Sequence, residues 1–524
     1  MLTPLSKILL GLVIVGVIGG GLVWLSRNPE VANKVAPGLA QKANETKATA
    51  KQRTAEENVI VVATNTCGGQ GGIAYMNNGS KDASTSSRFY TEFGQLVQIE
   101  VMDKFDESRA ALKSGAIDIL CFATCGEFSI EAGALAADEI KIYAQYDKSF
   151  GGDALVVREG INSVSDLRGK KIALAPGSPS HGLFLNLIKI SGYTQGEFDI
   201  IEAADGLEAA DFFRKEQVDA AFVWSPDDAK LPRDVAGAKV LLSTKSAPDI
   251  IWDVVLVKAD VASEKRAAIK NFIAGLLYGN TAINTNANVR AEAVEAMVAI
   301  YGLPAEDWSN LTIAKFMTLG DNLNFFGLNA SYTGVTGEEL YTRMGESYKD
   351  LKLNSGQPLV SGDIPSWREV SDNSIVLELK NHPKLSNSRQ SVDLPKKYTV
   401  ATAAEIVAPA VTTNLLPVEF ATGSAELSSE AKKLIRQNFA SLARGFSNRI
   451  RVEGNTDDVG GFDMNKQLSL RRAQSAKNYL VTFLKCDQNR IVVIGNGPAN
   501  PVADNHTGEG RQRNRRTEFE LIGQ

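Results

Sequence analysis

The strongest constraint on this chain is an alternation of short apolar strand patterns with amphipathic helix patterns, which begins abruptly at Val59. At 59–63 four β-branched residues are followed by an alanine, a pattern typical of a buried strand. The other strand-like runs, each separated from the next by a helical pattern or a turn, lie at 97–101, 117–120, 171–175, 220–224 and 251–257. This alternation predicts α/β layers with mostly parallel sheets.

One helix–turn–strand unit occurs twice, at 107–120 and at 207–221. In each copy an amphipathic helix and a short turn precede an aspartate, Asp118 or Asp219, which opens a buried strand. Two similar units about a hundred residues apart indicate two lobes with a cleft between them. Such a cleft is a common place for a small ligand.

The N-terminal segment contains eighteen uncharged residues from Ile8 to Leu25, enough to span a bilayer core of about 30 Å as a helix. The alternative is a cleaved signal peptide, whose apolar core is usually ~7–15 residues and ends in small residues. No such site follows Leu25, so we expect an uncleaved membrane anchor over 1–25. Residues 26–57 have almost no large apolar side chains and are interpreted as a solvated linker.

Three segments, VSDLRGKKIA at 164–173, GSPSH at 177–181 and QVDAAFVW at 217–224, carry a family resemblance. They resemble the second lobe of periplasmic solute-binding proteins, in the group that serves nitrate, sulfonate, taurine and pyrimidine-precursor uptake. The resemblance covers about residues 58–380 and implies a two-lobed domain of the type 2 fold that binds a small solute.

Polar residues at the ends of the predicted strands are the candidates for solute contacts. Hydroxyls at a helix start either bind an anion together with free N–H groups or merely cap the helix. A tryptophan at the end of a strand either stacks on a ligand or closes the hinge. Asp227 and Asp228 favour a cation or an amine, which conflicts with an anionic solute, so the solute stays unnamed. The candidates are Thr64, Asn65, Thr124, Ser178, Ser180 and Trp224.

Glycines and cysteines gather at the same expected cleft edge. The run Gly68–Gly72 forms either a nest of N–H groups or a flexible turn. Cys67, Cys121 and Cys125 follow predicted strands, and one pair of them is either disulfide-bonded in an oxidising compartment or left free. The spacing Cys121-Phe-Ala-Thr-Cys125 is not a zinc pattern, and the chain has only three histidines. We therefore expect no metal site.

After a linker at 381–411, three motifs follow in order: T-D-x-x-G at 456–460, N-x-x-L-S-x-x-R-A at 465–473 and G-R-x-x-N-R-R at 510–516. Residues 412–524 are identified by them as an OmpA-like peptidoglycan-binding domain, whose members hold the diaminopimelate of the peptide stem. The resemblance implies a site made of Thr456, Asp457, Asn465, Arg472 and Arg515.

A diaminopimelate head group carries a carboxylate and an amine together. Binding it requires one carboxylate and one fork-shaped guanidinium, which match Asp457 and Arg472. The alternative is that these two residues form an ordinary surface salt bridge.

The expected fold class is a two-lobed α/β domain followed by a small α+β OmpA-like domain, with an N-terminal transmembrane helix. A net charge of −5 does not suggest a nucleic-acid binder. No Ser-His-Asp order, zinc motif or phosphate loop is present, so we expect no enzyme, no catalytic residues and no cofactor.

The expected location is the bacterial inner membrane, in a single pass, with the bulk of the chain in the periplasm. The expected partners are peptidoglycan, an unknown small solute, the inner membrane and a possible membrane protein. The alternative is a structural tether between membrane and cell wall, whose two-lobed domain contacts another protein and binds no solute.

Overall fold

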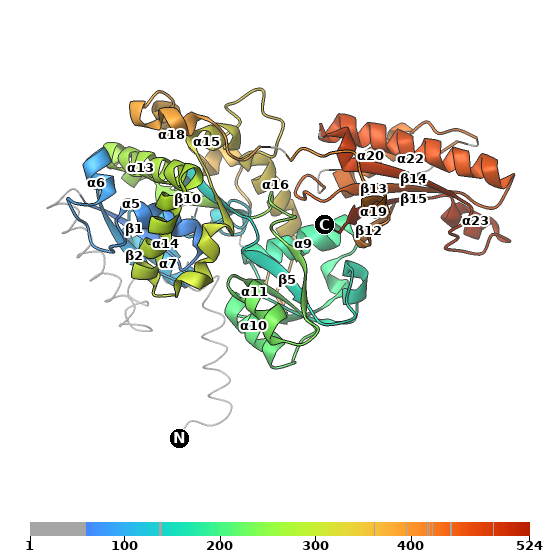
Figure 1. Cartoon of the computed structure of the whole chain (residues 1–524), viewed down its shortest axis with the longest axis horizontal. Helices are drawn as coiled ribbons and strands as arrows, with labels where there is room; N and C mark the ends of the chain where they lie inside the picture. Colours follow the sequence, from blue (N-terminus) through green and yellow to red (C-terminus); the bar gives the residue numbers. More distant parts are fainter. Residues whose placement is uncertain are drawn as a thin grey trace, which may run out of the picture.

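Three β-sheets organise the part of the chain that the computed structural model describes (Figure 1). This part comprises residues 59–135, 139–360, 362–394, 396–416, 418, 420–421, 423–440, 443–485 and 487–523. The predicted anchor at 1–25 and the linker at 26–57 lie outside it. Within these ranges no helix is both long and apolar enough to span a bilayer.

The first lobe is built on a six-stranded sheet with the order β11-β4-β10-β3-β1-β2. All six residues of β1 are buried, so its unbroken apolar run fits a central strand covered on both faces. The strands are β1 Val59–Thr64, β2 Leu96–Val101, β3 Ile119–Cys121, β4 Ile140–Ser149, β10 Trp252–Lys258 and β11 Ala314–Phe316. The helices are α5 Gly71–Met76, α6 Arg88–Phe93, α7 Phe105–Ser114, α8 Phe128–Leu135, α12 Ala259–Glu264, α13 Arg266–Thr285, α14 Ala287–Tyr301, α15 Leu319–Phe325, α16 Gly337–Tyr348, α17 Trp367–Val370 and α18 Ser374–Leu379.

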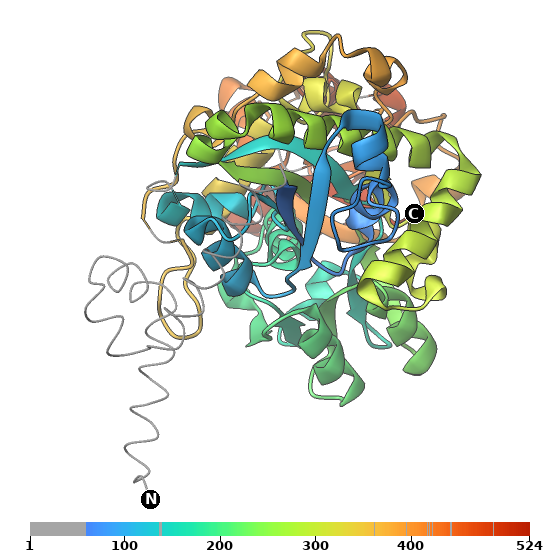
Figure 2. The same cartoon turned by 90° about the vertical axis from the view of Figure 1, so that its left-hand side faces the viewer.

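The second lobe is built on a five-stranded sheet with the order β7-β6-β8-β5-β9. Figure 1 shows this lobe in green below the first, and Figure 2 shows the first lobe from its outer side. The strands are β5 Asp153–Val157, β6 Lys171–Leu174, β7 Asp199–Glu202, β8 Ala220–Trp224 and β9 Lys239–Ser243. The helices are α9 Pro179–Ile190, α10 Gly206–Arg214 and α11 Asp227–Asp234.

The predicted strands are confirmed, with ends that shift by at most two residues. The prediction of mostly parallel sheets is wrong. Although β1 pairs in parallel with β2 and β3, and β6 with β7 and β8, every pair that involves β4, β5, β9, β10 or β11 is antiparallel. The chain passes between the lobes through β4–β5 and β9–β10, and these strands run against the parallel ones.

The repeated unit predicted from the sequence has the same structural role in both lobes. In the first lobe the Asp118 carboxylate accepts a hydrogen bond of 3.0 Å from the N–H of Val61 on β1. In the second lobe the Asp219 carboxylate accepts one of 2.9 Å from the N–H of Lys171 on β6. Each aspartate therefore joins its own strand to the parallel neighbour, which explains why an acidic residue opens a buried strand.

The C-terminal part is a four-stranded sheet with the order β12-β15-β13-β14. Helix α22 packs on β13 and β14, and its buried residues Ala473, Ala476 and Leu480 follow the helical period. The strands are β12 Ala410–Leu416, β13 Ile450–Asn455, β14 Ile491–Gly497 and β15 Thr517–Ile522. The helices are α19 Ala403–Ile406, α20 Ser429–Ile435, α22 Phe462–Leu484 and α23 Gly508–Asn514. The α-helical form of α20 ends at Ile435 and continues as a π-helical turn, Arg436–Ala440.

Candidate functional site

The site predicted in the C-terminal domain is assembled from three separate segments. Thr456 and Asp457 directly follow β13, Asn465 and Arg472 lie on α22, and Arg515 follows α23. The Asp457 carboxylate accepts a hydrogen bond of 2.6 Å from Nη1 of Arg515 and one of 3.2 Å from the N–H of Val459. The structure thus pairs Asp457 with Arg515, and not with Arg472 as in the surface-salt-bridge alternative.

Arg472 lies beside this pair, and it forms no ion pair with any of the described residues. Its side chain is 6% exposed, its Nε donates to the carbonyl of Ser424 at 3.1 Å, and its guanidinium lies 4.9 Å from the ring centre of Phe420. Burial and the nearby Arg515 lower the pKa of Arg472, while Asp457 opposes this shift. No carboxylate of the described chain lies within ion-pair distance of Arg472. A carboxylate from a ligand would therefore be stabilised here.

Thr456 and Asn465 complete the site with neutral groups. Nδ2 of Asn465 donates to the carbonyl of Val459 at 3.0 Å, so Asp457 and Asn465 together fix the loop at Val459. The Thr456 hydroxyl is buried and has no hydrogen-bond partner among the described residues. A buried hydroxyl without a partner costs free energy, and a polar ligand would remove that cost.

The candidate solute contacts of the first lobe are engaged in internal hydrogen bonds. Oγ1 of Thr64 accepts from the hydroxyl of Tyr301 at 2.9 Å, and Oδ1 of Asn65 accepts from Nε2 of Gln70 at 2.9 Å. Oγ1 of Thr124 accepts from the N–H of Glu127 at 3.4 Å. These three side chains thus shape the ends of their own strands.

In the second lobe, Ser178 is the N-cap of α9. Its hydroxyl accepts from the N–H of His181 at 3.4 Å and donates to the carbonyl of Ala175 at 2.7 Å. Ser180 meets Trp224, whose indole N–H donates to its hydroxyl at 2.8 Å. A Cβ on Gly206 would lie 2.8 Å from the Trp224 ring, so the indole packs directly on that glycine. The structure brings Ser180 and Trp224 together at the end of β8.

Sequence reasoning missed a group of buried carboxyls where the two lobes meet. Asp147 on β4 and Asp253 on β10 are direct cross-strand partners. Burial raises the pKa of Asp147 to about 6 and that of Asp253 well above its usual range. The pKa of Asp153, at the start of β5, is raised by burial to about 7, and that of Glu127 to about 8. An aspartate inside the apolar run at 251–257 was the one available signal.

The two neighbouring aspartates noted in the sequence, Asp227 and Asp228, have different roles in the structure. Asp227 forms an ion pair with Arg214 and is thereby neutralised within the second lobe. Asp228 accepts from the hydroxyl of Ser225 at 2.6 Å, and burial raises its pKa. Asp228 and Asp253 both raise the pKa of Asp153, so the three carboxyls share one region between the lobes.

The glycine and cysteine run follows β1. Gly68–Gln70 is a buried 3-10 turn that leads into α5. A Cβ on Gly69 would lie 2.1 Å from a carboxylate oxygen of Asp147, so only glycine fits there. The thiols of Cys67, Cys121 and Cys125 are free, and burial raises the pKa of each. No group of three potential metal ligands occurs in the described ranges.

Two family models match separate parts of the chain. Residues 87–295 match the model described as ABC transporter, phosphonate, periplasmic substrate-binding protein, and residues 419–515 match the OmpA family. The chain thus joins a periplasmic-binding-protein-like α/β fold to an OmpA-like domain. The second match contains all five residues of the C-terminal site.

Individual proteins resemble one part or the other. Outer membrane protein A of Bordetella avium is 41% identical over 130 residues, which cover 25% of this chain and 63% of that protein. The taurine-binding periplasmic protein of Escherichia coli K12 is 26% identical over 245 residues, 45% of this chain and 74% of that protein. The solved nitrate-binding protein NrtA of Synechocystis PCC 6803 is 12% identical with a TM-score of 0.48, covering 64% of this chain and 92% of that one. The chain spans only 63%, 32% and 44% of the length of the first three curated relatives.

Proposed function

We propose that this protein is anchored in the inner membrane, attaches non-covalently to peptidoglycan through residues 412–524, and binds a small solute through residues 58–380. The observation that carries the proposal is the buried guanidinium of Arg472, which lies beside the Asp457–Arg515 pair and has no ionic partner in the described part of the chain. A zwitterionic amino-acid head group supplies the missing carboxylate and an amine for Asp457. Co-sedimentation of the full chain with purified sacculi, with free diaminopimelate as competitor, tests this attachment.

For the solute, we infer a small molecule that carries both an amine and an acidic head. The carboxyls of Asp153, Asp228 and Asp253 favour an amine, whereas the N-terminus of α9 favours an anion. The similarity to a taurine-binding protein supports the same class, because taurine has both groups. Taurine is therefore the first compound to test by titration calorimetry.

Trp224 provides the sharpest test of the solute site. We expect Trp224→Ala to weaken taurine binding by about tenfold, since it removes the ring and leaves the Ser180 hydroxyl without its donor. Leu207→Ala is the matched control, because this neighbouring side chain of the second lobe is exposed. Titration calorimetry on the full chain measures both. Unchanged affinity in Trp224→Ala would make the tryptophan a packing residue of the second lobe only.

The second candidate function is a tether whose two-lobed domain contacts a protein partner. The internal hydrogen bonds of Thr64, Ser178 and Ser180 favour it, because these side chains already have partners. Native mass spectrometry of the purified full chain separates the two candidates. A retained small molecule supports solute binding. If no small molecule is retained and calorimetric titration with taurine gives no binding heat, the tether is supported.

The membrane anchor gives a further prediction. If residues 8–25 are an uncleaved span, the mature chain begins at or near Met1 and stays with the membrane fraction after a high-salt wash. Terminal sequencing of the protein purified from membranes provides the measurement. A mature N-terminus near residue 26 would contradict the anchor and indicate a cleaved signal peptide.

A further inference from the structure

The two lobes are joined by two crossover segments, residues 150–152 between β4 and β5 and residues 244–251 between β9 and β10. Opening or closing of a two-lobed protein bends such connections, because the packed lobes themselves move as rigid bodies. Whatever holds these segments therefore controls the angle between the lobes.

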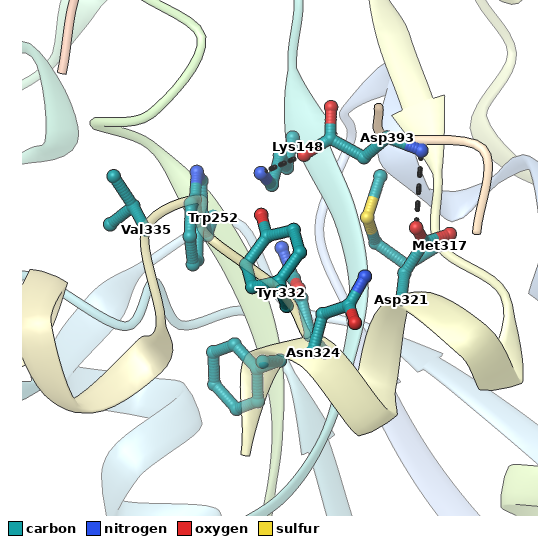
Figure 3. A pocket seen from close by; sticks show the side chains of 10 residues that line it. Lys148, Trp252, Met317, Asp321, Asn324, Tyr332, Val335 and Asp393 are labelled. Carbon is teal, nitrogen blue, oxygen red and sulfur yellow. Dashed lines mark hydrogen bonds and ion pairs between the residues drawn. The ribbon is translucent and has the colours of Figure 1, made fainter. Parts of the chain in front are cut away.

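Lys148, next to the first crossover, is the centre of a buried ionic cluster. Its side chain is 2% exposed, and Nζ lies 3.0 Å from Oδ1 of Asp249 in the second crossover. The same ammonium lies 3.7 Å from the ring centre of Trp252 and forms a second ion pair with Asp393. Figure 3 shows Lys148, Trp252 and Asp393 at the edge of a small pocket that Tyr332 also lines.

Asp393 belongs to the segment that leads from the first lobe to the C-terminal domain. It also pairs with Lys315 at 3.0 Å. Its N–H donates to the Asp321 carboxylate at 3.1 Å, as Figure 3 shows. The N–H of Val392 donates to the same carboxylate at 3.1 Å. The linker predicted at 381–411 is therefore attached at Val392 and Asp393 to the first lobe, next to the first crossover.

The C-terminal domain itself contacts the second crossover. The N–H of Asp249 donates to the carbonyl of Gly445 at 3.2 Å, and the N–H of Ser447 donates to the carbonyl of Ser246 at 2.7 Å. Asp249 is thus held on one side by Lys148 and on the other by the C-terminal domain.

The same domain also contacts both lobes. Arg444 forms an ion pair of 3.2 Å with Glu339 of the first lobe and donates to the carbonyl of Gly334 at 2.9 Å. On the second lobe, Nδ2 of Asn414 donates to the carbonyl of Ile190, at the end of α9, at 2.7 Å. A change in the angle between the lobes must break one of these two sets of contacts.

We propose that the linker and the OmpA-like domain form a clamp that holds the two lobes at a fixed angle. The clamp consists of three sets of contacts. Asp393 pairs with Lys148, and Gly445 and Ser447 form backbone hydrogen bonds with the second crossover. Arg444 contacts the first lobe, and Asn414 contacts the second. The position of the OmpA-like domain and the angle between the lobes are therefore coupled, so that a change in one shifts the equilibrium of the other. The inference goes beyond the proposed function, since it concerns the angle between the lobes whether or not a solute binds.

The test is a distance measurement between the lobes in the full chain. Spin labels are attached through a genetically encoded ketone-bearing amino acid at positions 81 and 215, both exposed, because cysteine labels would compete with the native thiols. In the parent we expect one narrow distance distribution by double electron–electron resonance. Arg444→Gln and Asp393→Asn should each add a longer-distance population that the parent lacks, and this population should be larger in the double variant than in either single variant.

Two substitutions of surface ion pairs serve as controls. Lys433→Gln removes an exposed pair with Glu430 within the C-terminal domain, and Glu378→Gln removes one with Arg266 within the first lobe. Both should keep the parent distribution. If Asp393→Asn unfolds the protein, Arg444→Gln alone tests the clamp. Arg444 is only partly buried, so its replacement should leave the fold intact. A distance distribution in Arg444→Gln that equals that of the parent would overturn the clamp. Failure of the parent protein to bind sacculi would count against the proposed function only.

Discussion

Replacing Arg472 by alanine should release the full chain from purified sacculi. In the structure this guanidinium is buried and has no carboxylate partner in the described part of the chain, so a carboxylate of the ligand can pair with it. Losing one partner of a desolvated charge pair costs on the order of 2–5 kcal/mol, which corresponds to a roughly thirtyfold to few-thousandfold loss of affinity. Co-sedimentation at several sacculus concentrations measures the change.

Asp457→Ala should reduce binding to a similar extent, because Asp457 binds the positive charge of the ligand where Arg472 binds the negative one. The substitution removes the acceptor for the ligand's amine and leaves Arg515 without its 2.6 Å partner. Arg472→Lys keeps the charge but loses the planar fork, so binding should fall only in part. Gln474→Ala, at an exposed position of the same helix, is the control. Sedimentation of Arg472→Ala and Asp457→Ala like the parent would show that this domain does not use the diaminopimelate site.

The second large effect concerns pH. The two lobes should become more stable as the pH falls from about 8.5 to 6, with an increase of several degrees in melting temperature. Burial raises the pKa of Asp147 to about 6, of Asp153 to about 7 and of Glu127 to about 8. In the unfolded chain these groups titrate near pH 4.

The sign follows from the protons bound in each state. Between about pH 8 and 5 the folded chain takes up protons that the unfolded chain does not, so lowering the pH favours folding. Above about pH 8 these carboxyls are charged in both states, and the folded state carries the full cost of their burial. The stabilisation is therefore lost as the pH rises through the raised pKa values.

Tryptophan fluorescence isolates this effect, because all described tryptophans lie in the two lobes and the sequence has none after Trp367. Asp253→Asn should flatten the pH dependence, since it removes one carboxyl of the Asp147–Asp253 pair. Asp363→Asn, at an exposed position, is the matched control. Melting temperatures that rise with pH over this range would contradict the assignment.

Much of the local structure could be predicted because the pattern that specifies it is itself local. The apolar run at 59–63 makes β1 recognisable from its composition alone, and the helical period of Ala476, Leu480 and Leu484 does the same for α22. The repeated aspartates could be noticed as well, although their bonds to Val61 and Lys171 needed the sheets to be assembled.

The sequence by itself determined the order of the elements and the α/β class, and it predicted the residues of the C-terminal site, because short motifs and periods carry that information. Only the tertiary structure decided which charges meet. Lys148 and Asp393 are 245 residues apart, Asp147 faces Asp253 through strand register, and Asp457 selects Arg515 over Arg472. The physical reason is that burial and distance govern electrostatic energy, and both arise only when remote segments pack together.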